Sequence, residues 1–285
     1  AQLVKNGENT IAIRMAMLWS GGGISADKDS IYLTDGNTSI SLAGQWLFNK
    51  DMEPVLPKIN NFQYRPEGLF NAMINPVIPF GIKGFIWYQG ESNSWDAYNY
   101  RTLFPMLITD WRQRWGLGNL PFLYVQLANY MKNQPLPSES EWAELREAQA
   151  LTLSLPNTGM ACIIDIGEAG NIHPGNKQEV GRRLALIANK QVYKQDIIAY
   201  GPTYKKFRKD GNRIRVRFSN VGSALAISSG KEVVGFAVAG NDRKFYWAKA
   251  TIEGDEVIVY SDQVAQPVAV RYAWADNPEC NLINS

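Results

Sequence analysis

Two segments of the chain leave an apolar run and continue with a burst of polar side chains. The first is QGESN at 89–93, which follows the apolar run at 84–88. The second is DIGEAGNIHPGNK, and its candidates for chemistry are Asp165, Glu168, Asn171 and His173. In open α/β sheets, ligands bind in the crevice beyond the carboxyl ends of the strands. The sequence therefore predicts that both segments line such a crevice.

His173 is the only histidine in the chain. A lone histidine is more often structural than catalytic. This one, however, follows an apolar run, lies in a loop rich in glycine and proline, and directly precedes a helical pattern. A general base belongs in such a place, exposed at a crevice on a rigid scaffold. One histidine with two cysteines, Cys162 and Cys280, does not make a zinc site, so no metal is expected.

A histidine base needs a nucleophile, and Ser92 lies in the other polar segment. The sequence GESNS does not match the G-x-S-x-G turn that exposes a nucleophilic serine. The loop could instead supply oxyanion donors. The Gly90 N–H and the Gln89 side-chain amide are groups that could hold a developing negative charge.

Carboxylates near the predicted crevice allow a different chemistry. A pair formed by Glu91 with Glu168 or Asp165 would suit a glycosidase, but the spacing alone does not support that interpretation. Gln126 is a further candidate for the crevice because it lies near the end of the apolar run PFLYVQLA. The residues by themselves leave these roles open.

The elements that must position these residues alternate between strand and helix from about residue 69 to residue 200. Apolar runs predict strands at 84–88, 121–128 and 159–167. Helical patterns cover 69–77, 100–115, 141–155 and 176–192. The last helix begins with Asn176 and Glu179 in capping-box spacing. Strands separated by helices of this length predict an α/β fold with a mainly parallel sheet covered on both faces.

The residues before this region have β character. Ile11, Ile13 and Met15 alternate with Ala12 and Arg14, which predicts a half-buried strand. The segment 56–68, LPKINNFQYRPEG, has the composition of a linker.

After about residue 200 the helical patterns stop. The segment NRIRVRF places Arg213, Arg215 and Arg217 on one face of a strand and apolar residues on the other. Several short strands with turns between them follow, which predicts a small β-sandwich. The basic residues between Lys205 and Arg217 fit a solvated strand face better than an anion site. We therefore expect three domains, at 1–50, 51–200 and 201–285.

Composition limits the partners. The chain has 285 residues, with 29 basic and 27 acidic side chains and a net charge of +2. This balance gives no electrostatic reason to expect nucleic acid or an anionic membrane as a partner. No apolar run approaches the roughly 20 residues that a membrane helix needs. Because the chain opens without an initiator methionine or a signal-peptide pattern, we expect Ala1 to be a cut inside a longer protein.

Three sequence stretches resemble the sialate O-acetylesterases, a family within the SGNH-type hydrolases. They are GLFNAMINPVIPFGIKGFIWYQGESN, REAQ and IDIGEAGNIHPGNKQEVGRRLAL. The resemblance extends over nearly the whole chain, and it is weakest in the C-terminal β region. It implies an incomplete three-layer parallel-sheet SGNH hydrolase core at 51–200. Residues 1–50 would end an inserted β-sandwich domain, and 201–285 would form a C-terminal one.

The resemblance also implies roles for individual residues. In this family the nucleophilic serine lies near the start of the hydrolase domain, so it should lie upstream of Ala1, and Ser92 is then a loop residue. Gln89 matches the position of an oxyanion-stabilising asparagine, and His173 matches the base. Many SGNH enzymes place an aspartate shortly before the histidine, where this chain has Asn171. Either a Ser–His dyad operates, or Glu91, Glu168 or Asp165 supplies the carboxylate.

The function that follows from the resemblance is removal of acetyl groups from sialic acid or a related acetylated glycan. The expected partners are that acetylated carbohydrate and the missing N-terminal segment, and no cofactor is implied. The family also suggests export to the periplasm or outside the cell. The alternative is a non-catalytic glycan-binding or structural module on a hydrolase fold.

Overall fold

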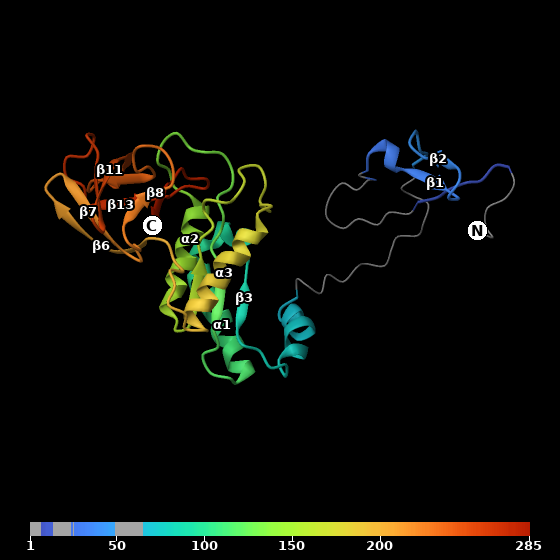
Figure 1. The fold of residues 1–285 in the computed structure, drawn as a ribbon, viewed down its shortest axis with the longest axis horizontal. Helices are drawn as coiled ribbons and strands as arrows, with labels where there is room; N and C mark the ends of the chain where they lie inside the picture. Colours follow the sequence, from blue (N-terminus) through green and yellow to red (C-terminus); the bar gives the residue numbers. More distant parts are fainter. Residues whose placement is uncertain (1–6, 14–23, 25, 49–64) are drawn as a thin grey trace. The chain divides into compact units, whose positions relative to one another are not determined.

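The computed structural model describes residues 7–13, 24, 26–48 and 65–285. The chain divides into two compact units, Ala1–Arg65 and Pro66–Ser285. The described part of the first unit holds a short helix, η1 (Lys28–Ser30), and an antiparallel hairpin of β1 (Tyr32–Thr34) and β2 (Ser39–Ser41) (Figure 1).

The strand predicted from Ile11 to Met15 is wrong over the residues that can be checked. Residues 11–13 lie outside any strand, and Met15 lies outside the described residues. Ile11 and Ile13 are both more than 40% exposed, because no neighbouring strand in the described residues pairs with them. Alternation of apolar residues makes a strand only where a partner supplies the hydrogen bonds. The expectation that 1–50 ends a β-sandwich domain stays a prediction.

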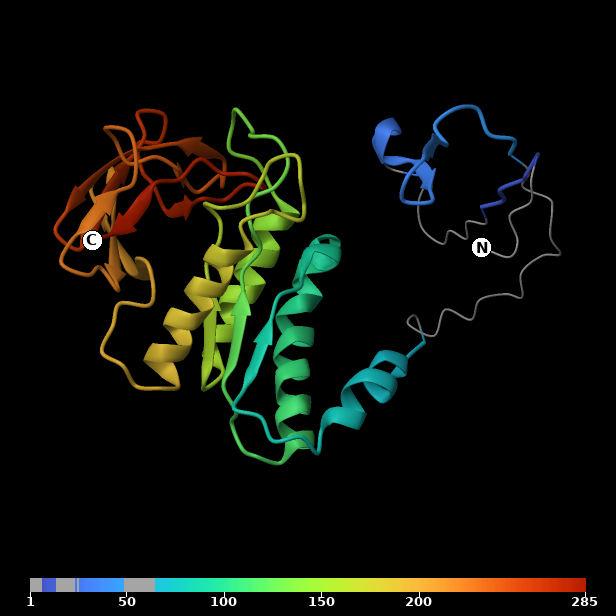
Figure 2. The same ribbon diagram turned by 45° about the vertical axis from the view of Figure 1, so that its right-hand side comes forward.

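The second unit begins with an α/β region. Its elements are η3 (Phe70–Ile74), η4 (Asn75–Val77), β3 (Phe85–Trp87), η5 (Glu91–Asp96), α1 (Ala97–Trp115), β4 (Phe122–Val125), α2 (Glu141–Leu151), η6 (Thr152–Ser154), β5 (Thr158–Ala161) and α3 (Lys177–Gln191). The strands form a three-stranded parallel sheet in the order β3-β4-β5. Figure 2 shows these strands running beside the helices.

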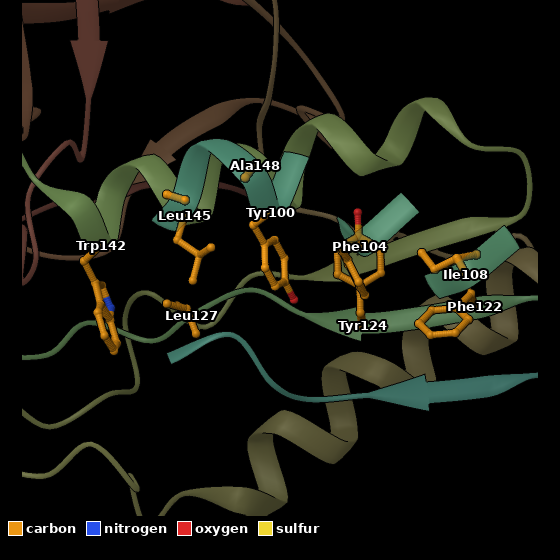
Figure 3. Packing of buried hydrophobic residues seen from close by; sticks show 10 residues of the cluster. Tyr100, Phe104, Ile108, Phe122, Tyr124, Leu127, Trp142, Leu145 and Ala148 are labelled. Atoms are coloured by element: carbon orange, nitrogen blue, oxygen red, sulfur yellow. The ribbon is translucent and has the colours of Figure 1, made fainter. Parts of the chain in front are cut away.

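Alternate residues of β4 build a core on each face of this sheet. Phe122 and Tyr124 are fully buried and pack against α1 and α2. Figure 3 shows them beside Tyr100, Phe104 and Ile108 of α1. Leu123 and Val125 point to the opposite face, where Val180, Leu184 and Ile187 of α3 cover them. The predicted parallel sheet with helices on both faces is therefore confirmed.

Local sequence fixes where the helices begin and end. The Ser140 hydroxyl accepts a hydrogen bond from the Ala143 N–H at 2.9 Å and caps α2. The predicted cap of α3 is present, since Asn176 accepts from the Glu179 N–H at 3.3 Å. α1 continues through Pro105 and ends at Gly116, whose φ of +65° is the left-handed conformation that glycine adopts freely. None of the described helices combines the length and apolar character that crossing a membrane requires.

The C-terminal part of the second unit is all β, as predicted. Its strands are β6 (Thr203–Asp210), β7 (Arg213–Ser219), β8 (Leu225–Ile227), β9 (Phe236–Ala239), β10 (Phe245–Trp247), β11 (Lys249–Glu253), β12 (Glu256–Tyr260), β13 (Ala269–Tyr272) and β14 (Leu282–Asn284). They form antiparallel sheets in the orders β11-β12-β7-β6, β10-β9-β13 and β14-β8. Apolar residues of these sheets share one core.

The alternation predicted for β7 is present. Ile214, Val216 and Phe218 are buried, while the arginines between them lie on the outer face. Arg215 pairs with Asp210 at 2.6 Å and with Glu253 at 2.9 Å. Arg215 and Arg217 are thus paired with carboxylates of neighbouring strands and turns, whereas the Arg213 guanidinium lies 5.1 Å from the ring centre of Tyr260.

The segment 273–279 joins the C-terminal sheets to the α/β region. The Arg146 guanidinium of α2 donates to the backbone oxygens of Ala273 and Ala275. The Ser140 hydroxyl donates to the Asp276 carboxylate at 2.5 Å, and the Asn129 amide donates to Asn277 at 2.8 Å. The loop that follows β4 is therefore bound by hydrogen bonds to the C-terminal region.

Candidate active site

The carboxyl ends of β3, β4 and β5 lie at one edge of the sheet because the strands are parallel. The loops beyond them contact one another. Lys177, at the start of α3, places its Nζ 4.7 Å from the ring centre of Tyr88, just after β3. The Gly167 N–H donates to Asn129 Oδ1 at 2.7 Å, which joins the loop after β5 to the loop after β4. Both polar segments singled out in the sequence therefore lie at this edge.

Gln89 is held in a defined orientation on the loop after β3. Its Nε2 donates to Asn93 Oδ1 at 2.7 Å, and the Tyr100 hydroxyl donates to its Oε1 at 3.3 Å. Burial raises the pKa of Tyr100 to about 12, so this hydroxyl keeps its proton at neutral pH. A side-chain amide carries two N–H protons, and only one of them is used here. The second remains available to an oxygen of a ligand.

Gly90 completes the candidate oxyanion donors. It is buried and has a φ of +155°, and its N–H makes no hydrogen bond within the described residues. A buried N–H without a partner is rare in proteins and indicates that something else accepts from it. Glu91 and Ser92 follow as the first residues of η5. The Ser92 side chain is exposed and, among the described residues, forms no hydrogen bond with His173 or any other group.

The loop that carries His173 is closed by Glu168. The Glu168 carboxylate accepts from the Gly175 N–H at 2.7 Å and from Asn171 Nδ2 at 3.3 Å. These bonds hold the pKa of Glu168 below its usual range, the Gly175 N–H contributing most. Asn171 Oδ1 in turn accepts from the His173 backbone N–H at 2.9 Å. Glu168 and Asn171 therefore fix the shape of the loop.

The imidazole of His173 has no orienting partner within the described residues. It is exposed, and no hydrogen bond to the ring is formed there. Asn171 binds the backbone N–H of His173, and Asp165 binds Arg183, with 2.7 Å between Oδ2 and Nη2. The Gln126 side chain donates to the Arg146 backbone oxygen at 3.0 Å and so supports α2. The roles predicted for these residues in orienting His173 or holding substrate stay predictions.

Gln149 was not among the residues singled out for the site. It is fully buried in α2, and its Nε2 donates to the backbone oxygens of Gln89 and Val125, both at 3.3 Å. Its Oε1 accepts from the Leu127 N–H at 2.9 Å. The only signal in the sequence was its place in the REAQ motif, next to a helix face that is otherwise apolar. One amide thus links the ends of β3 and β4.

A salt-bridge network at the start of α3 makes a testable contribution to stability. Arg182 and Arg183 bind Glu179 and lower its pKa to about 2. Because the pKa is lowered on folding, this stabilisation is complete above the unfolded value near 4.5 and is lost as the pH falls towards 2. The variant Glu179→Gln should therefore be less stable than the wild type at pH 6, and the difference should vanish near pH 2.

Urea unfolding at a series of pH values measures this effect, with Glu232→Gln as the control. Glu232 is exposed in the C-terminal region. Equal pH dependence of the Glu179→Gln and wild-type proteins would contradict the assignment.

No metal centre is formed by the residues that the structure describes, since they contain no group of three or more histidine, cysteine, aspartate or glutamate side chains placed to hold an ion. The candidate groups at this edge are instead amide and backbone donors on the loop after β3 and an imidazole on the loop after β5. Such a set is suited to acyl transfer, in which a base removes a proton and N–H groups stabilise an oxyanion.

Residues 57–189 match the family model described as carbohydrate esterase, sialic acid-specific acetylesterase. Sialate O-acetylesterase of Mus musculus is 39% identical over 160 residues, which are 48% of this chain and 29% of that protein. The Homo sapiens sialate O-acetylesterase is 28% identical over 233 residues, 74% of this chain and 44% of that protein.

A solved structure is also similar. The crystal structure of a carbohydrate acetylesterase from Xanthomonas citri has 49% sequence identity and a TM-score of 0.73, and the match covers 76% of this chain and 51% of that chain. The chain thus spans about half of that protein, and less than half of the curated mouse and human relatives.

Proposed function

Because the chain is related over residues 57–189 to the sialic acid-specific acetylesterase family of carbohydrate esterases, we propose that it belongs to an enzyme that removes acetyl groups from sialic acid or a related acetylated glycan. The observation that carries the proposal is the pair of unused donors at Gln89 and Gly90, at the same sheet edge as His173. An acetylated carbohydrate is the substrate.

The proposed reaction proceeds through an acyl-enzyme. His173 takes the proton of a serine hydroxyl as the serine oxygen attacks the acetyl carbonyl carbon. The electron pair of the carbonyl moves to its oxygen, where the Gly90 N–H and the second N–H of Gln89 Nε2 stabilise the negative charge. As the tetrahedral intermediate collapses, the bond to the sugar oxygen breaks and His173 returns the proton to that oxygen. Water, activated by the same base, then attacks the acyl-enzyme and releases acetate.

The serine of this scheme is proposed to lie on a segment outside these 285 residues. Two observations support a nucleophile other than Ser92: its sequence lacks the nucleophile turn, and its hydroxyl makes no hydrogen bond to a base. His173 then acts in a Ser–His dyad, or Glu91, Glu168 or Asp165 supplies a carboxylate. The chemistry needs no metal or organic cofactor. A periplasmic or extracellular location belongs to the same proposal and rests on the family resemblance alone.

Serine labelling and acetate release together test the proposal. The protein is purified from its natural source, with anything that copurifies, and incubated with O-acetylated sialic acids while released acetate is measured. A fluorophosphonate probe then labels the nucleophile, and peptide mass spectrometry locates it. We expect acetate release and a label on a serine outside these 285 residues. A label on Ser92 would overturn the assignment of the nucleophile. Glycan binding without acetate release or label would favour a binding module.

A further inference from the structure

The amide of Gln149 uses all of its donors on the backbone at the edge of the sheet. Nε2 gives one proton to the Gln89 oxygen and one to the Val125 oxygen, and Oε1 accepts from the Leu127 N–H. The side chain is fully buried. A buried amide satisfied in this way holds its partners rigidly, because breaking any of these bonds leaves a polar group without water.

The bond to Gln89 determines where the next N–H points. In a trans peptide the C=O and the following N–H point in opposite directions. Gln149 draws the Gln89 oxygen towards α2 and the protein interior, and the Tyr100 hydroxyl of α1 also lies within hydrogen-bond distance of this oxygen, at 3.4 Å. The Gly90 N–H of the same peptide is thereby directed away from α2. This N–H makes no hydrogen bond within the described residues, as expected of a donor directed at a ligand.

Close packing keeps Gly90 against the same helix. A Cβ at Gly90 would lie 3.1 Å from Gln149 Nε2, 3.2 Å from Leu145 Cδ2 and 3.3 Å from Leu127 Cδ2. A side chain at this position would therefore press against α2 and Leu127, and glycine lets the backbone lie close to them. Gln149 is the polar residue among these three neighbours, and only its side chain forms a hydrogen bond with the Gln89–Gly90 peptide.

We infer that Gln149 is a positioning residue for the oxyanion hole, which fixes the Gln89–Gly90 peptide so that the Gly90 N–H faces the carbonyl oxygen of the substrate. This role rests on the proposed esterase function. Gln149 itself does not touch the substrate. It acts on the transition state through Gly90, and its loss should lower kcat more than it changes KM.

The test replaces the amide by side chains of nearly the same size. In Gln149→Met both donors are lost, and kcat for acetyl-ester hydrolysis should fall roughly 10²-fold with KM within about twofold. In Gln149→Glu the buried acid stays protonated over part of the pH range, so one O–H can replace one donor. This variant should keep more activity than Gln149→Met. Its kcat relative to wild type should fall as the pH rises, because ionisation removes the O–H.

Gln191 provides the matched control. Its Nε2 also donates to two oxygens, the Thr158 backbone and the Tyr200 hydroxyl, but at the opposite end of the sheet. Gln191→Met should lower the melting temperature without the loss of kcat. If Gln149→Met and Gln191→Met have the same kcat, or if Gln149→Met raises KM alone, the positioning role is overturned.

An NMR readout separates this inference from the proposed function. Backbone amide resonances of Gly90 and Leu127 are compared in wild-type and Gln149→Met protein labelled with ¹⁵N. If the wild-type protein that includes the segment with the nucleophile hydrolyses no acetyl ester, the proposed function fails. Even in that case, the amide resonances decide whether Gln149 fixes the orientation of the Gln89–Gly90 peptide. A Gly90 resonance that moves with Leu127 supports the positioning, and one that stays in place overturns it.

Discussion

Replacing His173 by alanine is expected to lower kcat for acetyl-ester hydrolysis by about 10⁴-fold or more, which is the order of loss seen when a base of a Ser–His pair is removed. The imidazole is exposed and makes no hydrogen bond within the described residues, so its removal should leave the melting temperature unchanged. The measurement is a comparison of kcat and melting temperature in the same protein with and without the substitution.

Two further variants make this result specific. His173→Gln keeps a polar side chain but supplies no base, so it should be as inactive as His173→Ala. Asn171→Ala removes the bond to the His173 backbone N–H and should cost much less activity, because only the shape of the loop is affected. Full acetyl-ester hydrolysis by His173→Ala would contradict the base assignment. A glycosidase with a carboxylate pair would instead cleave a glycosidic bond, and its rate would not depend on His173.

The layered fold could be predicted because its signals are local. Apolar runs such as 121–128 have strand length, and the segments between them have helical spacing, so the order of elements determines a parallel sheet covered on both faces. The cap predicted at Asn176 is likewise a short-range signal. The strand expected near Ile11 failed because alternation does not reveal whether a partner strand is present.

The candidate site was only partly predictable, because its supports are distant in sequence. Gln149 bonds Gln89, which is 60 residues away, and no spacing rule connects an amide on one helix to a backbone oxygen after another strand. Asn171 shows a second limit of sequence-based prediction, because a matching position does not reveal which atoms a side chain binds. Its position matched that of an orienting aspartate, but its side chain binds backbone and a carboxylate rather than the imidazole. Sequence position pointed to this loop as a candidate, and the hydrogen bonds show which of its side chains stabilise it.

Arg146→Met is expected to lower the free energy of unfolding by about 3 kcal/mol, because several buried backbone oxygens lose a charged donor. Arg146 is 4% exposed and donates to the backbone oxygens of Ala273, Ala275 and Asp276. Burial lowers its pKa to about 10, so it remains charged at neutral pH. Methionine fills most of the same volume but leaves these oxygens without a donor.

Arg112 is a matched control for Arg146, because it is also a buried arginine that binds backbone oxygens, at the other end of the sheet. It is 7% exposed and donates to the backbone oxygens of Leu120, Pro156 and Asn157. Arg112→Met should cost a similar free energy in urea unfolding. Only Arg146→Met should speed hydrogen exchange in segment 273–279, because Arg146 forms hydrogen bonds with that segment and Arg112 does not. Since this segment holds Asn129 through Asn277, and Asn129 holds the Gly167 N–H, the loosening should extend to the loop of His173. Equal exchange of 273–279 in the two variants would show that Arg146 contributes stability without joining the C-terminal sheets to the site.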